Sequence, residues 1–309
     1  MHRRNSFHSI ISTKGCSIVD EDFRQILCHI LDYFQGNSQT YYHKSTNIGF
    51  LRYLLVRKAE KTGQILINLI TTSQSTLNEE EFVDLILNLN LKGTVKCIAH
   101  SIYDGVADVA RADEMKVLYG EDRIVEELLG LKFNISSFSF FQTNSLGAEK
   151  LYSTVRDFIG TTMDKTIFDL YSGTGTIGQI LAPTAKKVTG IEIVDEAVEK
   201  AAENAKLNNL TNCTFIAGDV LKKIDELDDK PDIIVLDPPR EGIHPKAIQK
   251  IINYNPQTFI YISCKPTSLS KDLPVFLDNG YRVEKVQCVD MFPMTGHVES
   301  LLLMKKVKK

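Results

Sequence analysis

The feature that most constrains this chain is a glycine-rich loop that follows an apolar run in its second half. Residues 167–178 read IFDLYSGTGTIG, so Gly173 and Gly175 come directly after a predicted strand and open a helix. Glycine permits a tight turn and lets a ligand approach the backbone closely. The next predicted strand, in VTGIEIVD, ends at Glu192, close to the roughly 20 residues expected before a carboxylate that holds ribose hydroxyls. This pattern predicts a nucleotide or nucleoside site; a plain tight turn is the structural alternative.

Strands and helices alternate through the rest of this half, which predicts an α/β fold with a doubly wound, Rossmann-like parallel sheet and helices on both faces. Helical patterns such as 196–208 and 244–253 lie between most of the strands. No helix separates the last two strands, so we expect a hairpin that places an antiparallel strand at the sheet edge. The predicted strands are 166–170, 187–192, 213–217, 232–236, 258–263, 281–290 and 299–304.

The first half has a different pattern, which predicts a separate α+β domain. Apolar residues at helical spacing predict a helix over 22–34, and Asn78 followed by three glutamates predicts the start of a second helix. Two β-type runs, 50–58 and 64–71, flank Gly63 and predict a hairpin with that glycine in the left-handed conformation. Further strands are expected at 94–102, 115–119 and 131–141.

The length of the chain agrees with two domains. Its 309 residues are about twice the ~150 of a typical domain, and 43% hydrophobic residues supply enough material for a core. The pattern changes near 136–145, so we expect an α+β domain over 1–138 and the Rossmann-like domain over 139–309. No apolar run approaches the ~18 residues of a membrane span, and MHRRNSFHSI lacks the apolar segment of a signal peptide. These features predict a protein without membrane contact. The six cysteines form no CxxC pair and no metal-ligand cluster, which predicts a reduced, cytoplasmic setting, and no obligate protein partner is evident.

Overall charge gives little sign of a nucleic-acid partner, because the net charge is -3 and the pI is about 6.2. The exception is a short basic arm that contains Arg3, Arg4 and Lys14, with no acidic residue before Asp20. This arm is a candidate contact for an RNA backbone, and a solvated terminus is the alternative.

The acidic residues around the glycine loop favour a cationic ligand over a dinucleotide. Asp169 precedes the loop, Asp219 follows the third strand of this half, and Asp237 opens the run DPPR after another apolar strand. Carboxylates would repel the diphosphate of a nicotinamide dinucleotide, whereas they would attract the sulfonium and amino groups of S-adenosylmethionine. Asp219 could reach an adenine amino group or only cap a helix. Together with the rigid proline pair at the sheet edge, these residues predict a class I S-adenosylmethionine-dependent methyltransferase.

Cys264, in FIYISCKP, is a candidate nucleophile because it lies just past a predicted strand at the same edge of the sheet. Lys265 could favour its thiolate, and Pro266 would hold the sulfur in place. C5 of uracil is a poor nucleophile, but thiolate addition at C6 gives a C5 enolate that accepts a methyl group. The proton on C5 must then leave to a base, for which Glu299 in TGHVESLLL is the candidate. The alternatives are an inert buried thiol and a solvent-exposed glutamate at a strand end.

In combination, these motifs resemble the RNA uracil-5-methyltransferases, including the 23S rRNA and tRNA enzymes. The resemblance covers residues from about 1 to 306 and is carried by SFSFFQTN, DLYSGTGTIG, GIEIV, DPPR, ISCKPTSL and DMFPMTGHVE. It implies Cys264 as the nucleophile and Glu299 as the proton-abstracting base. It also implies that S-adenosylmethionine is contacted by residues of several loops, namely Gln142, Tyr171, Glu192 and Asp237, in addition to the loop glycines Gly173 and Gly175. Asp219 matches the family's adenine-side position.

The resemblance also implies residues on the substrate side. Phe140 matches an aromatic that packs near the target base, and stacking of a flipped uracil on an aromatic ring is physically reasonable; core packing is the alternative. Arg240, Arg3 and Arg4 complete the substrate-side candidates. The sequence therefore predicts an S-adenosylmethionine-dependent RNA (uracil-C5-)methyltransferase that acts on structured RNA, with rRNA favoured over tRNA on resemblance alone.

Two departures from the family pattern affect RNA affinity and metal content. Family members usually carry a small β-barrel RNA-binding domain before the point where this sequence begins, so we expect a truncated form or a late start, and weakened RNA binding. Many members hold an iron–sulfur centre with four cysteines, and Cys16 in KGCSIVD matches the last of them. One cysteine cannot hold a cluster, so we expect no metal site in this chain.

Three other functions remain open from the sequence. An amino-group methyltransferase would place an aromatic residue after the proline pair, where Arg240 stands, and would need no thiol. A DNA cytosine-C5 enzyme would carry its nucleophile in a Pro-Cys pair earlier in the chain. A non-catalytic RNA-binding protein with a relic cofactor pocket is the third, and the presence of both Cys264 and Glu299 argues against it.

Overall fold

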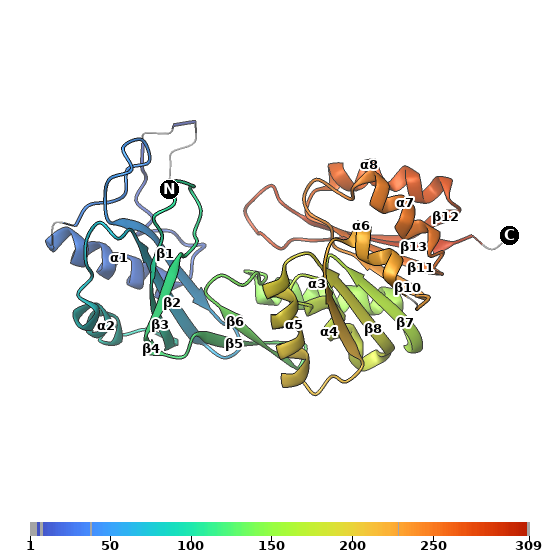
Figure 1. Ribbon diagram of the computed structural model, residues 1–309, viewed down its shortest axis with the longest axis horizontal. Helices are drawn as coiled ribbons and strands as arrows, with labels where there is room; N and C mark the ends of the chain where they lie inside the picture. The colour runs from blue at the N-terminus through green and yellow to red at the C-terminus, as the bar shows by residue number, and fades with distance from the viewer. Residues whose placement is uncertain (1–4, 7–8, 38, 228, 308–309) are drawn as a thin grey trace. The chain divides into compact units, whose positions relative to one another are not determined.

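The structure is a computed structural model that describes residues 5–6, 9–37, 39–227 and 229–307 (Figure 1). It divides into two compact units. The first comprises the described residues of Met1–Glu126 together with Ile135–Phe138, and the second comprises Glu127–Asn134 together with Ser139–Lys309. The sequence pattern placed the division at 138, whereas residues 127–134 group with the second unit. None of the described helices combines the length and the hydrophobicity needed to cross a bilayer.

The first unit is a four-stranded sheet, in the order β1-β2-β3-β4, with two helices packed on one face. The hairpin β1–β2 turns through Gly63 with φ +67°, and Asn78 accepts the amide of Glu81 (3.3 Å) at the start of the second helix, both as predicted. Ile26, Phe34 and the other apolar residues of the helices form one core with the sheet. The elements are α1 (Glu21–Gly36), β1 (Leu51–Lys58), β2 (Gln64–Thr71), α2 (Glu79–Leu87), β3 (Thr94–Ile102) and β4 (Glu114–Gly120).

Two short strands, β5 (Arg123–Leu128) and β6 (Leu131–Ser136), form a separate two-stranded sheet that spans the division between the units. The sequence analysis missed β5 and extended the β6 prediction to residue 141. The buried side chains of β5 are Ile124, Glu126 and Leu128. Because the middle one is a glutamate, the sequence does not show the alternation of apolar and polar residues that predicts a strand. Glu126 is buried because its carboxylate accepts the backbone amides of Glu60 (2.6 Å) and Lys61 (3.0 Å).

The second unit is built on a seven-stranded sheet in the order β12-β13-β11-β10-β7-β8-β9, with helices on both faces (Figure 1). Helices α3 and α4 share one core with the sheet, and α6, α7 and α8 share the other, which confirms the predicted doubly wound α/β arrangement. The strands are β7 (Thr162–Leu170), β8 (Ala185–Glu192), β9 (Cys213–Ala217), β10 (Ile233–Leu236), β11 (Thr258–Ser263), β12 (Tyr281–Val289) and β13 (Glu299–Lys306). The helices are α3 (Ser145–Ile159), α4 (Thr176–Leu181), α5 (Asp195–Leu207), α6 (Val220–Lys223), α7 (Pro245–Asn253) and α8 (Pro266–Asp278), with short 3-10 turns at Ala182–Thr184 and Ile224–Glu226.

The last hairpin corrects one expectation. The antiparallel strand β13 lies between β11 and β12, so it is an inner strand and β12 forms the edge. The physical reason is the burial pattern: residues 299–304 of β13 are all buried, whereas most of β12 is exposed or half-buried. A strand that is apolar on both faces is stabilised by neighbours on both sides and by helices above and below it.

The strand order reverses between β7 and β10, and this reversal positions the candidate site. Leu170 at the end of β7 pairs with Leu236 of β10 on one side and with Ile191 of β8 on the other. Leu236 in turn pairs with Tyr261 of β11. The loops that follow β7, β8, β10 and β11 therefore leave the sheet from one edge, which is where open α/β sheets bind their ligands.

Candidate functional site

The loop after β7 has a backbone that only particular residues adopt easily. Tyr171, Gly173 and Gly175 all have positive φ, at +66°, +53° and +70°. A Cβ on Gly175 would lie 2.5 Å from the ring of Phe215, so this position needs glycine for space as well as for conformation. Tyr171 carries a side chain in the same backbone region, which costs free energy and is typical of functional sites.

Glu192 lies at the end of β8 and is tied to the glycine loop. One carboxylate oxygen accepts the amide of Gly173 (2.9 Å), and the other accepts the amide of Val194 (3.0 Å). Two hydrogen bonds leave further lone pairs on both oxygens. The carboxylate is thus fixed beside the loop with acceptor capacity left for hydroxyl groups such as those of a ribose.

Asp169, two residues before Tyr171, is fully buried and only partly satisfied. Its Oδ2 accepts the amide of Gly178 (2.8 Å), whereas its Oδ1 has no hydrogen-bond partner among the described residues. Burial raises the pKa of this carboxyl to about 7; the Gly178 hydrogen bond opposes the shift, and the neighbouring Glu192 carboxylate adds to it. An orphaned carboxylate oxygen in the core is costly unless a ligand completes its bonding.

Asp237 and Glu299 add two more acids to this region. Burial, together with the nearby carboxylates of Glu299 and Asp169, raises the pKa of Asp237 to about 8. Glu299 is only 5% exposed, and burial raises its pKa as well. The alternative of a solvent-exposed strand-end glutamate is therefore wrong. Among the described residues none of these three acids forms an ion pair within 4 Å, and the pKa of each is raised, so no protein cation stabilises their ionised forms.

Cys264 is half-buried directly after β11. Burial raises the pKa of its thiol, the carboxylates of Glu299 and Asp237 raise it further, and the guanidinium of Arg240 lowers it. The expected help from Lys265 does not appear among these effects. The cation that acts on the thiol is Arg240.

Two contacts hold the loops around this edge together. The hydroxyl of Ser268 in the first turn of α8 donates to the carbonyl of Arg240 (2.6 Å), which ties the DPPR loop to the loop that carries Cys264. Asn144 caps α3 by accepting the amide of Gly147 (2.9 Å) and donates to the carbonyl of Met291 (3.1 Å). The loop before α3 is thus fixed to the loop that leads to β13.

The site contains one residue that the sequence analysis missed. Tyr152 of α3 is 4% exposed, and its hydroxyl is hydrogen-bonded to Gln142. Burial raises the pKa of this hydroxyl, Asp237 raises it further, the bond to Gln142 acts in the opposite direction, and Asp169 and Glu299 also raise it. A tyrosine among apolar residues at helical spacing is typical of a core position, so the sequence carried no signal for it.

Phe140 lies on the surface of the site. Its side chain is 69% exposed, so the alternative of core packing is wrong. The hydroxyl of Thr174 in the glycine loop donates to its carbonyl (3.4 Å), which places Phe140 beside the loop. Arg3 and Arg4, the other substrate-side candidates, lie outside the described residues.

Asp219 caps α6 through a hydrogen bond from the amide of Leu221 (2.9 Å), so the helix-cap alternative is what the structure shows. It still lies close enough to affect Tyr171. Burial raises the pKa of Tyr171 to about 12, and the carboxylates of Asp219 and Asp272 contribute to the rise. Asp219 is therefore both a cap and a negative charge beside the loop.

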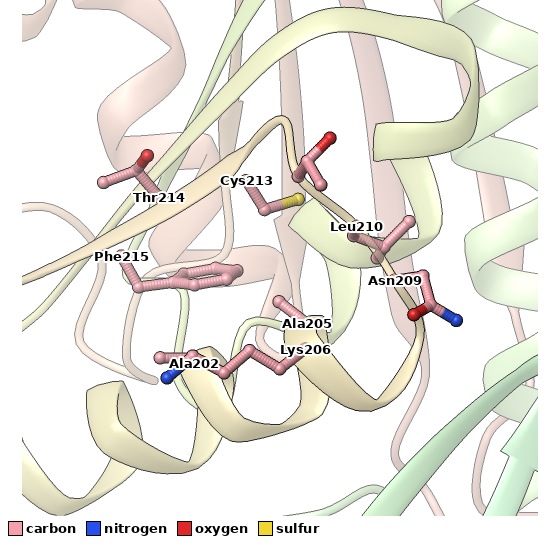
Figure 2. A pocket seen from close by; sticks show the side chains of 9 residues that line it. Ala202, Ala205, Lys206, Asn209, Leu210, Cys213, Thr214 and Phe215 are labelled. Atoms are coloured by element: carbon pink, nitrogen blue, oxygen red, sulfur yellow. The ribbon is translucent and has the colours of Figure 1, made fainter.

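Cys16 has a free, half-buried thiol, and within the described ranges no three or more His, Cys, Asp or Glu side chains are grouped so as to hold a metal ion. A hollow of about 610 Å³ lies between α5 and β9 (Figure 2). None of the predicted site residues lines it. Its lining consists of Ala202, Ala205, Lys206, Asn209, Leu210, Thr211, Cys213, Thr214 and Phe215.

The residues at the carboxyl edge fit S-adenosylmethionine. Its sulfonium and ammonium groups are cations, and the edge holds the unpaired carboxylate Asp237 and the orphaned oxygen of Asp169. Its adenosine ribose presents two hydroxyls, and Glu192 retains acceptor capacity beside the close-approach glycines. The arrangement therefore suits an adenosine that carries positive charge.

Known proteins agree with this interpretation. Residues 39–307 match the family described as tRNA (uracil-5-)-methyltransferase. An uncharacterized RNA methyltransferase of Clostridium tetani is 54% identical over 302 residues, which cover 98% of this chain and 66% of that protein. One from Caldanaerobacter subterraneus is 51% identical over 306 residues, covering 99% of this chain and 68% of that protein. The chain thus spans about two thirds of the length of the curated relatives it matches.

Solved structures give the same result for the fold. The Pyrococcus abyssi tRNA (uracil-54, C5)-methyltransferase, solved in complex with S-adenosyl-L-homocysteine, matches with a TM-score of 0.81 and 25% identity over 96% of this chain and 70% of that one. The M. jannaschii tRNA m1G37 methyltransferase matches with a TM-score of 0.51 and 17% identity over 86% of this chain and 79% of that one, which supports the fold alone. These matches confirm the predicted family resemblance, fold class and enzyme class.

Proposed function

The chain belongs to the tRNA (uracil-5-)-methyltransferase family, and from this premise we propose that it transfers a methyl group to C5 of a uridine in structured RNA through a covalent bond from Cys264 to C6. One observation carries the proposal. The thiol of Cys264 is within electrostatic reach of the carboxylates of Glu299 and Asp237 and of the guanidinium of Arg240. A nucleophile, a buried base and a cation at one sheet edge are the groups that this chemistry requires.

The cofactor residues are assigned by the chemistry that each one offers. S-adenosylmethionine supplies a methyl group on a positively charged sulfur. Gly173 and Gly175 allow close approach of the ligand, and Glu192 accepts hydrogen bonds from the ribose hydroxyls. Asp237 faces the positive charge. Its pKa is raised by burial and by the neighbouring carboxylates of Glu299 and Asp169, so a cation bound beside it would favour its ionised form.

Three further residues complete the proposed cofactor site. Gln142 presents its amide from the loop before α3, and Tyr171 packs at the start of the glycine loop. Asp219 offers its remaining oxygen to the adenine amino group while it caps α6.

The thiol of Cys264 acts as the nucleophile. It loses its proton, which Arg240 favours and the carboxylates oppose, and the thiolate adds to C6 of the uracil. The electron pair of the C5–C6 double bond moves into the enolate. C5 would then form a bond to the methyl carbon while the bond from that carbon to the sulfonium sulfur breaks, with the neutral thioether S-adenosylhomocysteine as the leaving group. The next step needs a base to take the C5 proton before the sulfur can leave.

Glu299 is that base. It is buried at the start of β13, and its raised pKa makes the carboxylate a stronger base than a solvated one. It takes the proton from C5, the C5–C6 double bond reforms, and the C6–S bond breaks to release the Cys264 thiolate. The proton passes from Glu299 to solvent, which balances the reaction.

We assign RNA binding to exposed residues near the carboxyl edge of the seven-stranded sheet and to the first unit. Phe140 offers an exposed aromatic ring on which an extruded base can stack, and Arg240 offers a positive charge for a phosphate or a base. We assign RNA recognition to the α+β unit, with the basic arm of Arg3 and Arg4 as an added phosphate contact.

The chemistry is tested by replacing the nucleophile. Cys264→Ala should abolish transfer of labelled methyl from S-adenosylmethionine to RNA while cofactor binding survives. Cys288→Ala, which removes an exposed free thiol on β12, is the matched control and should remain active. RNA that contains 5-fluorouridine has no proton to lose at C5, so the wild-type enzyme should form a stable covalent adduct with it. Full activity in Cys264→Ala rejects the mechanism, and RNA binding without methyl transfer or adduct would support the non-catalytic alternative.

The class of RNA is the second part of the proposal. We propose rRNA as the substrate, on the resemblance of the sequence motifs. tRNA is the second candidate, and the observation that supports it is that the similar solved structure from Pyrococcus abyssi is a tRNA enzyme. Mass spectrometry of separated rRNA and tRNA from a strain that lacks the gene distinguishes them. Loss of 5-methyluridine from rRNA supports the first candidate, and loss from tRNA alone replaces it with the second.

A further inference from the structure

Arg240 lies in a tight turn between β10 and α7. The amide of Gly242 donates to the carbonyl of Pro239 (2.8 Å), so Arg240 is a central residue of this turn. Asp237 at the start of the connection is held by the sheet, because its amide donates to the carbonyl of Leu170 on β7 (3.4 Å). The turn lies further from the strand and needs other contacts to keep its place.

Those contacts come from one face of α8. The hydroxyl of Ser268 donates to the carbonyl of Arg240 (2.6 Å), and Oδ2 of Asp272 accepts the amide of Ile243 (2.8 Å). Ser268 and Asp272 are four residues apart in one helix, so their side chains lie on the same side of it. The first bond holds the turn at Arg240 itself, and the second holds the residue directly after Gly242.

Asp272 is in turn fixed by the sheet. The hydroxyl of Tyr261, a residue of β11 that is 1% exposed, donates to the same Oδ2 (2.6 Å). The carboxylate also packs directly against the turn, since a Cβ on Gly242 would lie 2.8 Å from Oδ2. A carboxylate that is anchored to a buried strand and packed on the turn backbone leaves the turn little freedom to move.

The helix that holds this turn also follows the candidate nucleophile. Cys264 lies two residues before Pro266, where α8 begins, and the amide of Ser268 donates to the carbonyl of Lys265 (2.9 Å). One helix therefore fixes the backbone of the Cys264 loop and the backbone of the Arg240 turn.

A second serine of α8 shows that this use of a hydroxyl is not a general property of the helix. Ser270 is exposed, and its hydroxyl donates to the carbonyl of Thr267 (2.9 Å) within the helix. Ser268 is 3% exposed and donates outside the helix, to the Arg240 turn. The two serines thus offer a matched pair for substitution.

We propose that Ser268 and Asp272 are positioning residues of the methyl-transfer site: they hold the turn of Arg240 against the loop of Cys264, so that the guanidinium stays beside the thiol. This inference rests on the proposed function for the roles of Cys264 and Arg240. Ser268 and Asp272 act through the backbone of the turn and do not touch the reacting atoms.

The consequence for the thiol has a definite sign. Besides burial, the carboxylates of Glu299 and Asp237 raise the pKa of Cys264 and the guanidinium of Arg240 lowers it. Asp237 is held by the sheet and Glu299 by β13, so a loosened turn moves the cation and leaves the carboxylates in place. The pKa of the thiol should therefore rise when the anchors are removed.

The first test follows alkylation of Cys264 by iodoacetamide between pH 7 and pH 10 in the free full chain, by mass spectrometry of the peptide that contains this residue. We expect the midpoint of the pH profile to rise by about half a unit in Asp272→Ala and by less in Ser268→Ala. Ser270→Ala is the matched control and should leave the midpoint unchanged. An unchanged midpoint in Asp272→Ala and Ser268→Ala, or an equal shift in Ser270→Ala, overturns the inference.

Two further variants separate positioning from a general packing effect. Asp272→Asn keeps an oxygen that can accept from Ile243 and Tyr261, so it should restore most of the wild-type profile. In an Arg240→Gln background, Asp272→Ala should no longer shift the midpoint, because the cation through which it acts is gone. An equal shift in both backgrounds overturns the inference.

The second test measures methyl transfer in a single turnover with saturating RNA and S-adenosylmethionine. Asp272→Ala should lower the rate about tenfold, because the groups around the thiol are misplaced. Affinity for S-adenosylmethionine should stay within about threefold of wild type, since Asp237 keeps its place. The control is Glu149→Ala, which removes a half-buried helical carboxylate that accepts the amide of Leu129 (3.0 Å) and should keep the wild-type rate.

The two tests distinguish a failure of this inference from a failure of the proposed function. A wild type that transfers no methyl group to RNA, but whose alkylation profile shifts in Asp272→Ala, rejects the proposed function alone. An active wild type whose alkylation profile and transfer rate are the same in Asp272→Ala rejects this inference alone.

Discussion

The two units bury acidic side chains in opposite ways. In the first unit Asp22 is fully buried in α1, where it accepts the amides of Lys92 (2.7 Å) and Gly93 (2.9 Å) and pairs with the ammonium of Lys58 (2.8 Å). Burial alone would raise the pKa of this carboxyl, but the Lys58 ammonium and the two amides outweigh it and hold the pKa below its usual range. The protein itself therefore supplies both the cation and the hydrogen-bond donors that stabilise the Asp22 carboxylate.

In the second unit Asp169 and Glu299 are buried and Asp237 is half-buried, none of them pairs with a cation of the described residues, and their pKa values are raised. The free-energy cost of burial is left for a ligand or a reacting proton to offset. We use this difference to separate buried acids that serve the fold from the acids of the proposed site, because Asp22 and Asp169 are both fully buried aspartates and differ in their partners.

The backbone shows the same contrast. Among the described residues of the first unit, the only side chains at positive φ are asparagines, Asn5 and Asn47, which adopt this region readily. The second unit places Leu129, Tyr171 and Met294 there. Leu129 lies in the turn between β5 and β6, Tyr171 opens the glycine loop, and Met294 lies in the loop before Glu299. Two of these three strained positions are therefore in loops of the proposed site, and none is in the first unit.

The largest effect is expected at the proposed base. Glu299→Gln removes the proton acceptor and should lower the rate of methyl transfer about a thousandfold. It should not lower stability, because it also removes an unpaired buried charge. Single-turnover assays and urea unfolding measure the two quantities.

The matched control for Glu299→Gln is Glu126→Gln in the first unit, since that carboxylate is equally buried but accepts two backbone amides. The control should lose stability by about 1 to 3 kcal/mol. If both variants lost stability and kept their activity, Glu299 would be a structural acid like those of the first unit.

The next effect concerns the paired acid. Asp22→Asn leaves the half-buried ammonium of Lys58 with Asp20 as its one ionic partner among the described residues, and we expect a loss of about 3 kcal/mol in the free energy of unfolding. Glu21→Gln, which removes a surface pair with Lys92, should cost less than about 1 kcal/mol. Urea denaturation at pH 7 measures both. A cost for Asp22→Asn no larger than that for Glu21→Gln would contradict the contrast between the units.

The pH dependence of stability should have opposite signs in the two units. The pKa of Asp237 is raised to about 8 in the folded protein, so between pH 4 and pH 8 the folded state holds a proton that the unfolded state has lost. Stability from this group therefore falls as pH rises through that window, by roughly 2 kcal/mol between pH 5 and pH 8 once coupling to its neighbours is allowed for. The pKa of Asp22 is lowered, so its contribution is present above the unfolded pKa of about 4 and is lost as pH falls below it.

Unfolding of the wild type and of Asp237→Asn at pH 5 and pH 8 tests this sign. In the variant, the free energy of unfolding should fall less between pH 5 and pH 8 than in wild type. Its decline below about pH 4 should be the same as in wild type. A decline at pH 8 that is the same in both proteins would assign it to other groups.

The glycine loop, Glu192, Asp237 and Cys264 could be predicted from the sequence for one physical reason. Parallel strands end at one edge, so residues that follow apolar runs are brought together whatever the details of packing. The hairpin through Gly63 was predictable in the same way, because a turn depends on local backbone preferences.

Long-range neighbours could not be predicted in this way. The strand β13 lies between β11 and β12 because its apolar side chains need cover from both neighbours. Which strand takes the inner place depends on the whole sheet and not on local sequence. The cation near Cys264 is Arg240 and not the adjacent Lys265, because adjacent residues at a strand end point in different directions. Tyr152 joins the site only once α3 packs on the sheet.

The smallest effect tests the contrast in backbone strain. Met294 has φ +69°, is 87% exposed and lies in a turn closed by the amide of Thr295 on the carbonyl of Phe292 (3.1 Å). Met294→Gly removes the steric cost of the side chain at positive φ, although glycine also gains entropy in the unfolded chain. We expect a net gain of about 0.5 kcal/mol, seen as a small rise in the thermal midpoint. Asn255→Gly, at an exposed asparagine with φ +57°, is the control and should give no gain, because asparagine already tolerates this region. An equal response of the two variants would mean that Met294 stores no more strain than an ordinary turn residue, and the backbone would then no longer distinguish the two units.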